Sequence, residues 1–546
     1  MLGKIRILPA ILFALLSPAA RAENPPTTLW VQSWNGPNNH EDIGRFVAVD
    51  TPDRIYVAGS TYEPGAGGAG HDYLLLQYDS DGNLNWFRRY GGQGEETLSD
   101  LAVPVSGEVI VTGFSPGLNS LEVATVKYDQ LGDILWERRH PARGASSDYG
   151  PKLAVDGEKN VIVSAADAGD YLALKYAPDG TLLWSRTYDG PASQDDFATD
   201  VAVDAGGNVY LTGAANSLHA FATVKLSPAG DFLWEQIEPG DIGSVFAPSK
   251  LAVGPDNNVV VAGSPESTCG VFQFKIWKCA SASGAVLWSD KQPSQPCSSF
   301  IFRDLTLDES GAALAACSGS AGGVEGHMQV LRYSTDGVRE WIREYDGPGT
   351  AEDTAEAIAA DAVGAAYVVG STDFPPQNRD YAAAKFSAAG EQEWSFTWAS
   401  PHGTNDLAHD ICVDPAGGVI LTGNSFDQVQ NENVVSIKLL QATAAGVAES
   451  SPGAAPPVQL RMEPNPAFGE ATISYVLPRA GRIRLDLLSA DGRLLRTLAE
   501  GPCSTGLHTI HWSASGAEGL GLPGGVYFLR LEAGGRVTTT KAGLLR

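Results

Sequence analysis

Several short stretches of this sequence have the residue types of reactive sites, but their contexts argue against chemistry. Gly113-Phe114-Ser115-Pro116-Gly117 has the spacing of the turn that presents a nucleophilic serine in hydrolases, yet that turn must join a strand to a helix. The stretch from Gly519 to Gly524 is spaced like a dinucleotide-binding loop, but a strand-like run follows it instead of a helix. We therefore expect no catalytic residue in either stretch.

Acidic residues recur as neighbouring pairs and are the best candidates for cation binding. The pairs are Glu41-Asp42, Glu95-Glu96, Asp195-Asp196 and Glu352-Asp353. Carboxylates are calcium ligands, but the regular recurrence of these pairs favours a structural part in which they cap loops. The nine His residues lack the spacing of a metal site. We expect no cofactor and no metal site, with calcium as the alternative for the acidic pairs.

The six Cys residues contain neither an adjacent pair nor a CxxC motif. Cys269, Cys279, Cys297 and Cys317 lie close together in the sequence, and three pairings among them are possible in an oxidising compartment. A strand between Cys269 and Cys279 would hold these two far apart. We favour a disulfide between Cys297 and Cys317.

A repeat runs through most of the chain and must position all of these residues. Its clearest mark is a Trp every 48 to 56 residues, in most cases four residues after a Gly, as in APDGTLLW and SPAGDFLW. Such a phrase is typical of a tight turn that enters a strand. We expect these Trp residues to be structural and to pack between neighbouring repeats. They are Trp30, Trp86, Trp136, Trp184, Trp234, Trp288, Trp341 and Trp394.

A second phrase between successive Trp residues, such as AVDAGGNVYLTG, adds another hairpin to each repeat. Four strands per repeat are the content of one propeller blade. The last repeat lacks its turn and Trp, whereas Trp30 precedes the first repeat without a hairpin of its own. We therefore predict an all-β fold in which residues 23–441 form an eight-bladed β-propeller closed by the N-terminal strand.

Charged residues also recur at fixed places in the repeat. Acidic residues precede the first turn, and basic residues precede the second, so both fall on one rim of the predicted ring. We expect structural ion pairs there. The acidic residues are Asp50, Asp156, Asp204, Asp308, Asp361 and Asp414, and the basic residues are Lys127, Lys175, Lys225, Lys275, Arg332, Lys385 and Lys438.

The N-terminus has the features of a secretory signal. Residues 1–22 combine Lys4 and Arg6 with an apolar run, and the small residues before Glu23 place the cleavage between Ala22 and Glu23. The run is too short to cross a bilayer, and we expect no transmembrane span. The net charge of −27 opposes nucleic-acid binding, which depends on basic residues. These features predict a protein that is secreted or held at the bacterial cell surface.

Residues 442–457 are small and Pro-rich and are typical of a linker. Residues 458–546 then alternate in short strand-like runs, such as TISYVL and VYFLRL, which predict a small Ig-like β-sandwich.

Two parts of the chain resemble known bacterial families. The repeats, best seen from Thr187 to Gly213, resemble SBBP-type propeller repeats, which occur mostly in exported proteins of unassigned role. The C-terminal part is similar to the sorting domain of type IX secretion cargo. This resemblance implies that the secretion machinery is a partner and that the protein crosses the outer membrane. It rests on phrases that contain Pro464, Asn465, Pro466, Gly492, Gly525, Tyr527 and Lys541.

These features favour a non-catalytic surface protein that binds a glycan, a protein or a matrix ligand through residues still unknown. The alternative is a propeller enzyme, either a quinoprotein-like oxidoreductase or a hydrolase or lyase. Quinoproteins place an adjacent Cys pair over their cofactor, and this chain has no such pair.

Overall fold

The computed structural model describes residues 25–441 and 459–545, apart from short segments between strands and residues 514–524. The chain divides into two compact units, Met1–Ala442 and Thr443–Arg546. The predicted signal segment, with Ala22 and Glu23, and the predicted linker of residues 442–457 lie outside the described residues.

The described part of the first unit consists of eight antiparallel sheets of four strands each. The first four sheets are β2–β5 (Asp42–Val49, Ile55–Gly65, Gly68–Tyr78, Leu84–Tyr90), β6–β9 (Thr97–Ala102, Val109–Pro116, Leu121–Tyr128, Ile134–Pro141), β10–β13 (Lys152–Val155, Val161–Asp167, Asp170–Tyr176, Leu182–Tyr188) and β14–β17 (Phe197–Val203, Val209–Ala215, Ala220–Leu226, Phe232–Pro239).

The other four sheets continue in the same order, and the last of them recruits β1. They are β18–β21 (Phe246–Val253, Val259–Pro265, Phe274–Cys279, Val286–Gln292), β22–β25 (Ser299–Leu307, Ala313–Ser320, His327–Tyr333, Arg339–Tyr345), β26–β29 (Asp353–Ala360, Ala366–Phe374, Asn378–Phe386, Gln392–Trp398) and β30–β32 (Asp406–Val413, Val419–Gln428, Asn431–Leu440) with β1 (Thr27–Trp34).

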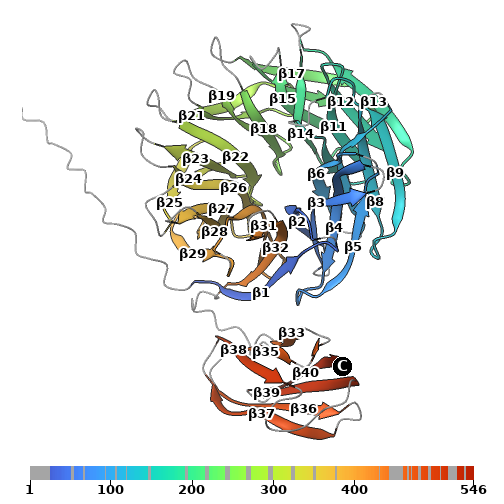
Figure 1. Ribbon diagram of the computed structural model, residues 1–546. Helices are drawn as coiled ribbons and strands as arrows, with labels where there is room; N and C mark the ends of the chain where they lie inside the picture. The colour runs from blue at the N-terminus through green and yellow to red at the C-terminus, as the bar shows by residue number, and fades with distance from the viewer. Residues whose placement is uncertain are drawn as a thin grey trace, which may run out of the picture. The chain divides into compact units, whose positions relative to one another are not determined.

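The sheets stand around a common centre, as Figure 1 shows. We call the first strand of each sheet its inner strand; these are β2, β6, β10, β14, β18, β22, β26 and β30. Each inner strand contacts the inner strand of the next sheet, and the contact of β30 with β2 closes the circle. Four-stranded sheets in a closed circle define a β-propeller.

The N-terminal strand completes the last sheet. β1 pairs antiparallel with β32, and Trp30 lies opposite Lys438. The predicted pairing of the N-terminal segment with the last repeat is therefore observed. It gives β32 a partner on the side that would otherwise be a free sheet edge.

The repeated Trp residues join neighbouring sheets. The indole Nε1 of Trp136 donates a hydrogen bond to the carbonyl oxygen of Pro178 in the next sheet, at 2.9 Å, and six other blade Trp residues donate to a backbone oxygen in the same way. Trp394 donates instead to the side-chain Oε1 of Gln441, at 3.5 Å. The ring of Trp136 also packs against Gly180, whose φ of 82° requires a residue without a Cβ. Six of the eight Trp residues are buried; Trp86 and Trp288 are intermediate.

Ion pairs occupy the turn rim of the sheets, as predicted, with one change of residue. Asp156 with Lys175 (2.9 Å), Asp308 with Arg332 (2.6 Å) and Asp414 with Lys438 (2.8 Å) are buried pairs. In β20 the residue opposite Trp288 is Lys278, so the predicted choice of Lys275 was wrong. The following turn, Ala280 to Ala285, is one residue longer than the equivalent turn Ala177 to Thr181.

Where the repeat lacks its Asp, another carboxylate takes over. Lys127 pairs with Glu108 at 2.9 Å, and Lys278 pairs with Asp256 at 2.7 Å. Asp50 instead lies 3.5 Å from Arg54. The ion pair of the turn rim is thus kept in most sheets even though the position of its acid varies.

The second unit contains two sheets whose apolar faces share one core. A three-stranded sheet comprises β33 (Gln459–Glu463), β35 (Glu470–Leu477) and β38 (Gly506–Ser513). A five-stranded sheet has the order β34 (Ala467–Phe468), β40 (Arg536–Leu545), β39 (Gly525–Ala533), β36 (Gly481–Ser489) and β37 (Leu494–Cys503). Ile473 and Tyr475 from the first sheet and Leu485 and Leu529 from the second belong to the same buried cluster.

Candidate functional site: the central channel

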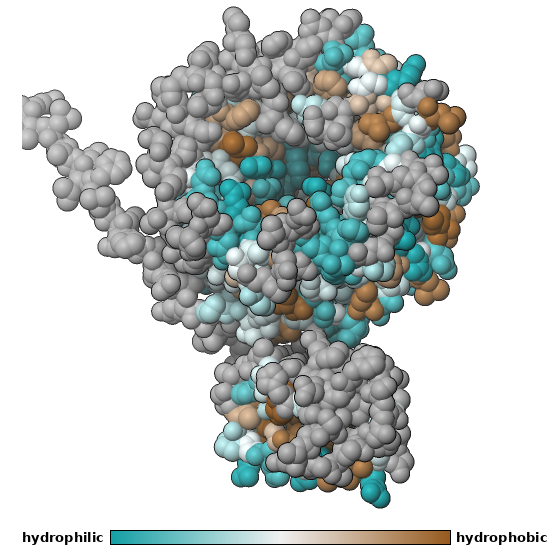
Figure 2. All heavy atoms as spheres, in the orientation of Figure 1, coloured by the Kyte–Doolittle hydropathy of each residue, from teal (hydrophilic) through white to brown (hydrophobic). Residues whose placement is uncertain are grey.

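The inner strands surround a hollow at the centre of the first unit. Figure 2 shows hydrophilic side chains gathered around this hollow. A cavity of about 320 Å³ within it is lined by residues of all eight inner strands, among them Arg45 of β2, Asp200 of β14 and Asp410 of β30. We call this space the central channel.

Four Asp residues fasten the inner strands to one another. Asp200 accepts a hydrogen bond from the backbone N–H of Val201 in its own strand (2.9 Å) and another from Leu251 in the next inner strand (2.9 Å). Asp100, Asp304 and Asp410 each make the same two bonds in their own places, at 2.8 or 2.9 Å. Each of these carboxylates therefore bridges two sheets with charge-assisted hydrogen bonds.

The bridging Asp is found in every second sheet. At the same place in the remaining sheets, four residues before the first-turn position, stand Phe46, Lys152, Lys250 and Ala357. The Asp of β30 bonds to Val47 of β2, so one of these bridges crosses the point where the circle closes. The channel wall consequently has a period of two sheets, whereas the fold has a period of one.

The channel perturbs the charges that line it. Burial raises the pKa of Asp200 to about 6 and the pKa of Asp410 to about 7, although their backbone hydrogen bonds act in the opposite direction. Burial also lowers the pKa of His409 to about 4, more strongly than the hydrogen bond to Asn424 raises it. His409 is therefore neutral at physiological pH.

Lys250 forms an ion pair across two sheets of this network. Its Nζ is 2.6 Å from Oδ1 of Asp304, and 41% of its side chain is accessible. Burial alone would lower the pKa of Lys250, but the neighbouring Asp304 and Asp200 carboxylates outweigh burial and raise it. Lys250 therefore carries a positive charge in the channel at any physiological pH.

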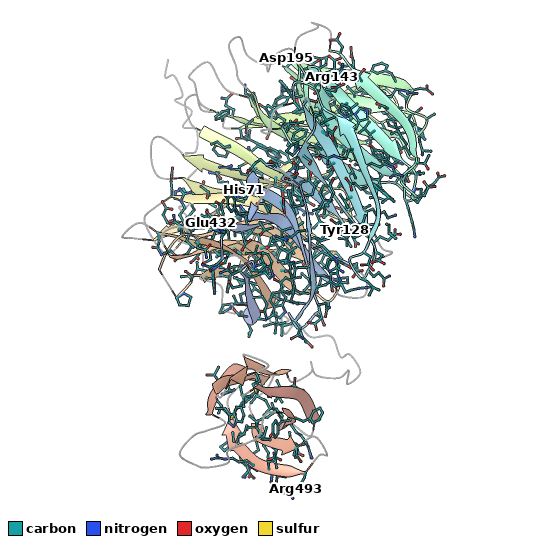
Figure 3. The ribbon with its side chains drawn as sticks, turned by 45° about the vertical axis from the view of Figure 1, so that its right-hand side comes forward. His71, Tyr128, Arg143, Asp195, Glu432 and Arg493 are labelled. Carbon is teal, nitrogen blue, oxygen red and sulfur yellow. The ribbon has the colours of Figure 1, made fainter. Side chains whose placement is uncertain are left out.

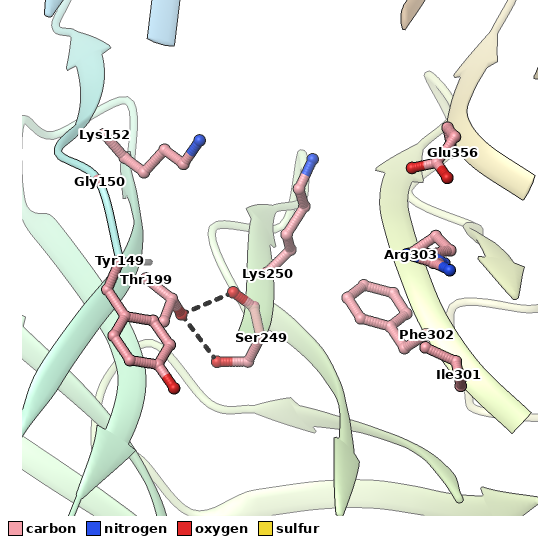
Figure 4. A pocket seen from close by; sticks show the side chains of 10 residues that line it. All are labelled: Tyr149, Gly150, Lys152, Thr199, Ser249, Lys250, Ile301, Phe302, Arg303 and Glu356. Carbon is pink, nitrogen blue, oxygen red and sulfur yellow. Dashed lines mark hydrogen bonds between the residues drawn. The ribbon is translucent and has the colours of Figure 1, made fainter. Parts of the chain in front are cut away.

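A second cavity, of about 340 Å³, lies along one side of the channel. We call it the side pocket. Figure 4 shows Lys152 and Lys250 on one wall and Arg303 and Glu356 on the other, with open space between them. Its remaining lining residues are Tyr149, Gly150, Thr199, Ser249, Ile301 and Phe302.

Some polar groups of the side pocket already make hydrogen bonds within the protein, and others do not. Thr199 donates to the backbone oxygen of Ser249 at 2.8 Å. Lys152 donates to the backbone oxygen of Ser99 at 2.7 Å and lies 5.4 Å from the centre of the Phe46 ring. In contrast, the Nε of Arg303 is buried and has no hydrogen-bond partner among the described residues. Such a buried donor is costly to leave unpaired.

The acidic pairs lie on the rim opposite the turns, and their second members cap loops. Asp42 accepts from the N–H of Gly36 at 2.6 Å, and Asp196 accepts from Gly190 at the same distance. Glu96 and Asp353 accept from Gly92 and Gly347 in the same way. This arrangement matches the structural part that the repetition of the pairs suggested.

Two His residues join the acidic groups on this rim. His71 lies 2.5 Å from Glu95 and 3.5 Å from Glu41, and Glu432 of the last sheet lies in the same region of the ring (Figure 3). His327, Asp346 and Asp353 offer ligand atoms within 4.8 Å of one another and are the described residues best placed to hold a metal ion. Since Asp353 already caps its loop, this group has a structural use without an ion.

Of the two residues in the predicted disulfide, the structure describes only Cys317. Cys317 has a free thiol and is completely buried in β23, where it packs in the core with Phe274 and Phe302. Its thiol is therefore enclosed in the core between sheets. Cys297 lies outside the described residues.

The residues of the predicted sorting motif are partly described. Gly525 begins β39, Tyr527 is buried in the core of the second unit, and Lys541 stands in β40 opposite Phe528. Pro464, Asn465, Pro466 and Gly492 lie outside the described residues.

The residues of the channel wall were missed in the sequence, although a signal for them exists. Asp100, Asp200, Asp304 and Asp410 each stand four residues before the first-turn position of their repeat. An alignment of the repeats on that position shows Asp in alternate copies. The turn and Trp phrases recur in nearly every repeat, whereas this Asp recurs only in every second one and is therefore less conspicuous.

Comparison with known proteins finds a family model that is similar to part of the repeat region, but it identifies no activity. Residues 122–321 match the family model described as outer membrane protein assembly factor BamB. No curated protein matches the sequence. In the part of the chain that the structure describes, no helix is long and apolar enough to cross a membrane.

Solved structures with similar folds have low sequence identity. A quinohemoprotein alcohol dehydrogenase from Comamonas testosteroni is 12% identical with a TM-score of 0.44, covering 79% of this chain and 78% of that one. PorZ, a surface component of the type IX secretion system of Porphyromonas gingivalis, is 13% identical with a TM-score of 0.38, covering 90% and 68%. The polysaccharide lyase Uly1 is 9% identical with a TM-score of 0.41, covering 63% and 89%. We transfer no activity from these proteins.

Proposed function

We propose that this protein is an exported, eight-bladed propeller that binds a ligand in its central channel without chemically changing it. The ligand is a glycan, a protein or a matrix component at the cell surface or outside the cell. The observation that supports the proposal best is the side pocket, because it combines charged side chains, among them Arg303 with an unpaired Nε, with a rigid β-sheet wall.

Several features of the pocket suit binding. A volume of about 340 Å³ lies within the range of about 300 to 1,000 Å³ that is usual for ligand pockets. Strands of five sheets, β10, β14, β18, β22 and β26, contribute to its lining, and four of them hold the charged groups in place. Binding sites on rigid scaffolds keep their geometry better than sites on isolated loops.

Export and sorting complete the proposal. Residues 1–22 would direct the chain across the inner membrane, and residues 458–546, as an Ig-like sorting domain, would engage the type IX secretion machinery. These assignments rest on the sequence phrases and on the resemblance of the C-terminal part to secretion cargo.

The enzymatic alternative predicts a different result. A quinoprotein-like protein would oxidise alcohols after reconstitution with its quinone, and a hydrolase or lyase would shorten the ligand that it binds. Among the described channel residues, His409 could act as an acid or a base, but a hydrogen bond of 2.6 Å to Asn424 already engages this neutral imidazole. Binding without turnover is therefore the function that we favour.

Glycan and peptide arrays probed with the full chain after signal removal test the proposal. We expect defined hits whose binding weakens at least tenfold in the double variant Lys152→Glu/Arg303→Glu. Lys159→Glu, an exposed charge change on the turn after β10, is the matched control and should leave the hits unchanged. Hits that are indifferent to the channel variant, or ligands that are cleaved or oxidised, would contradict the proposal.

A further inference from the structure

The charges of the side pocket differ in sign from those of the chain as a whole. The chain has a net charge of −27, yet the pocket lining contains three cations, Lys152, Lys250 and Arg303, and one carboxylate, Glu356. Cations gathered in a recess of an acidic protein focus the local potential toward anions. This contrast indicates that the pocket selects its ligand by charge.

The three cations are available to a ligand to different degrees. Lys250 is held by Asp304, whereas Lys152 is bonded only to a neutral backbone oxygen. Arg303 has a buried Nε that no described group satisfies. A carboxylate or sulfate oxygen would supply the acceptor that this guanidinium lacks, and Arg is well suited to bind such groups through two parallel bonds.

The single carboxylate of the pocket, Glu356, opposes anions less than an ordinary glutamate would. Burial raises the pKa of Glu356, and the nearby Arg303 lowers it by less. At mildly acidic pH the protonated fraction of Glu356 is therefore larger than that of an ordinary glutamate. A protonated Glu356 donates a hydrogen bond and adds no negative charge.

The rest of the lining suits a sugar better than a peptide. Tyr149 stacks on Phe197 with ring centres 5.1 Å apart, and with Phe302 it adds apolar surface beside the hydroxyl groups of Thr199 and Ser249. A sugar ring presents an apolar face and hydroxyl groups, which match such a lining.

A peptide would need a different surface. Extended peptides bind sheets by pairing with the free N–H groups of an edge strand. On the channel side three such groups are already used: the N–H groups of Leu153, Leu251 and Ile358 donate to Asp100, Asp200 and Asp304. At these positions the bridging carboxylates block the pairing that would recognise a peptide backbone.

We propose that the side pocket binds an acidic saccharide, whose carboxylate or sulfate group is held by Arg303 and Lys152 while its ring lies against Tyr149. This inference rests on the proposed function and narrows the ligand to one chemical class. The anion contacts Arg303 and Lys152, Lys250 supplies long-range attraction, and Glu356 limits the affinity.

Isothermal titration of the full chain with four polymers tests the class. Polygalacturonate carries carboxylates, dextran sulfate carries sulfates, dextran is the neutral control, and poly-glutamate is the acidic peptide. We expect binding to polygalacturonate or to dextran sulfate and no binding to dextran. Which of the two polymers binds shows whether the pocket prefers a carboxylate or a sulfate. The affinity should fall steeply with added salt, because exposed charges are screened.

Single variants locate the site. Arg303→Ala and Lys152→Ala should each weaken binding about tenfold, and Arg303→Lys should restore part of it. Glu356→Gln should strengthen binding severalfold. Lys159→Ala is the matched control, since Lys159 is exposed on the turn after β10 and lines neither the channel nor the side pocket, and should change affinity by less than twofold. Thermal unfolding of each variant confirms that it is folded.

The outcomes separate this inference from the proposed function. Equal binding of dextran or poly-glutamate, or no loss in the Arg303 and Lys152 variants, would overturn the acidic-saccharide assignment. A neutral ligand that is lost in the same variants would overturn it too, but would leave channel binding intact. Array ligands that ignore every channel variant would overturn both.

Discussion

At the scale of single residues, the channel wall depends on carboxylates that serve as cross-links between sheets. Asp410 is the most perturbed of these, with a pKa raised to about 7, and it joins β30 to β2 through Val47. It is partly exposed to the channel, so water moderates the effect. Its protonation is nevertheless linked to the stability of the ring.

The pH dependence of stability follows from the direction of this shift. Between pH 4 and pH 7 the unfolded chain has lost the Asp410 proton while the folded chain keeps it, so this group favours folding less as pH rises. Asp410→Asn removes the titration and one acceptor. We expect a destabilisation of about 1 kcal/mol that is largest near pH 4 and smallest near pH 8, measured by urea unfolding.

Asp156→Asn is the control for this prediction because it has the opposite sign. Burial would raise the pKa of Asp156, but hydrogen bonds from Asn160 and Lys175 outweigh it and lower the pKa. The contribution of Asp156 is present at neutral pH and disappears on acidification. If Asp410→Asn showed the same pH profile as Asp156→Asn, the assignment of the Asp410 proton would be wrong.

At the scale of elements, the ring depends on β1 as the outer strand of the last sheet. Trp30 of β1 is 3% exposed, donates to the carbonyl oxygen of Ser80 in the first sheet and packs on Gly82. These contacts repeat what Trp136 does in the middle of the ring. Closure by β1 should therefore be as strong as an ordinary junction between sheets.

Removal of the two Trp side chains tests this equivalence. We expect Trp30→Ala and Trp136→Ala each to lower the free energy of unfolding by roughly 3–5 kcal/mol, the usual cost of a large buried aromatic. Chemical unfolding measures both values, and size-exclusion chromatography reports association through an exposed β32 edge. A Trp30→Ala protein as stable as the wild type would show that closure does not depend on β1.

The sequence predicted the elements well because their signals are local. Turn glycines, alternating apolar residues and the Trp phrases led to sheets of four antiparallel strands and to the pairing of β1 with β32. The error at Lys275 concerns spacing: Lys278 lies ten residues before Trp288, whereas Lys175 lies nine before Trp184, and the additional residue in the turn after β20 accounts for this difference of one. Lys275 lies 13 residues before Trp288 and does not fit the repeat. The burial of Cys317 could not be predicted because it depends on the neighbouring sheet.

The channel site could not be predicted in the same way. Lys152, Arg303 and Glu356 are separated by long stretches of sequence and meet only because the sheets form a closed circle. Nothing near Arg303 in the sequence indicates that its Nε will be buried without a partner. The bridging Asp residues were detectable by alignment of the repeats, but their bonds to the next strand were not.

At the scale of the whole molecule, the two units should have separate tasks. They are distinct compact units, each with its own apolar core. We expect the C-terminal unit to direct secretion and the first unit to bind the ligand. Loss of one should therefore leave the other able to fold.

Truncation before Ala454 tests the division of tasks. In a bacterium that has the type IX machinery, the truncated chain should accumulate in the periplasm, while the full chain reaches the surface; cell fractionation and surface proteolysis measure the difference. Urea unfolding of the purified truncated chain, compared with the full chain, checks that the first unit still folds. Surface display of the truncated chain at the wild-type level would refute the sorting assignment.

Because the Asp bridge recurs in every second sheet, half of the equivalent positions of the channel wall carry other residues. Phe46, Lys152, Lys250 and Ala357 occupy rungs where no Asp bridge has to be kept. The side chains at these positions, which contact a ligand, can thus change in related proteins while the Asp bridges between sheets are kept. Positions that bridge the sheets and positions that can change therefore alternate around the channel wall, so the interior can diversify without loss of ring closure.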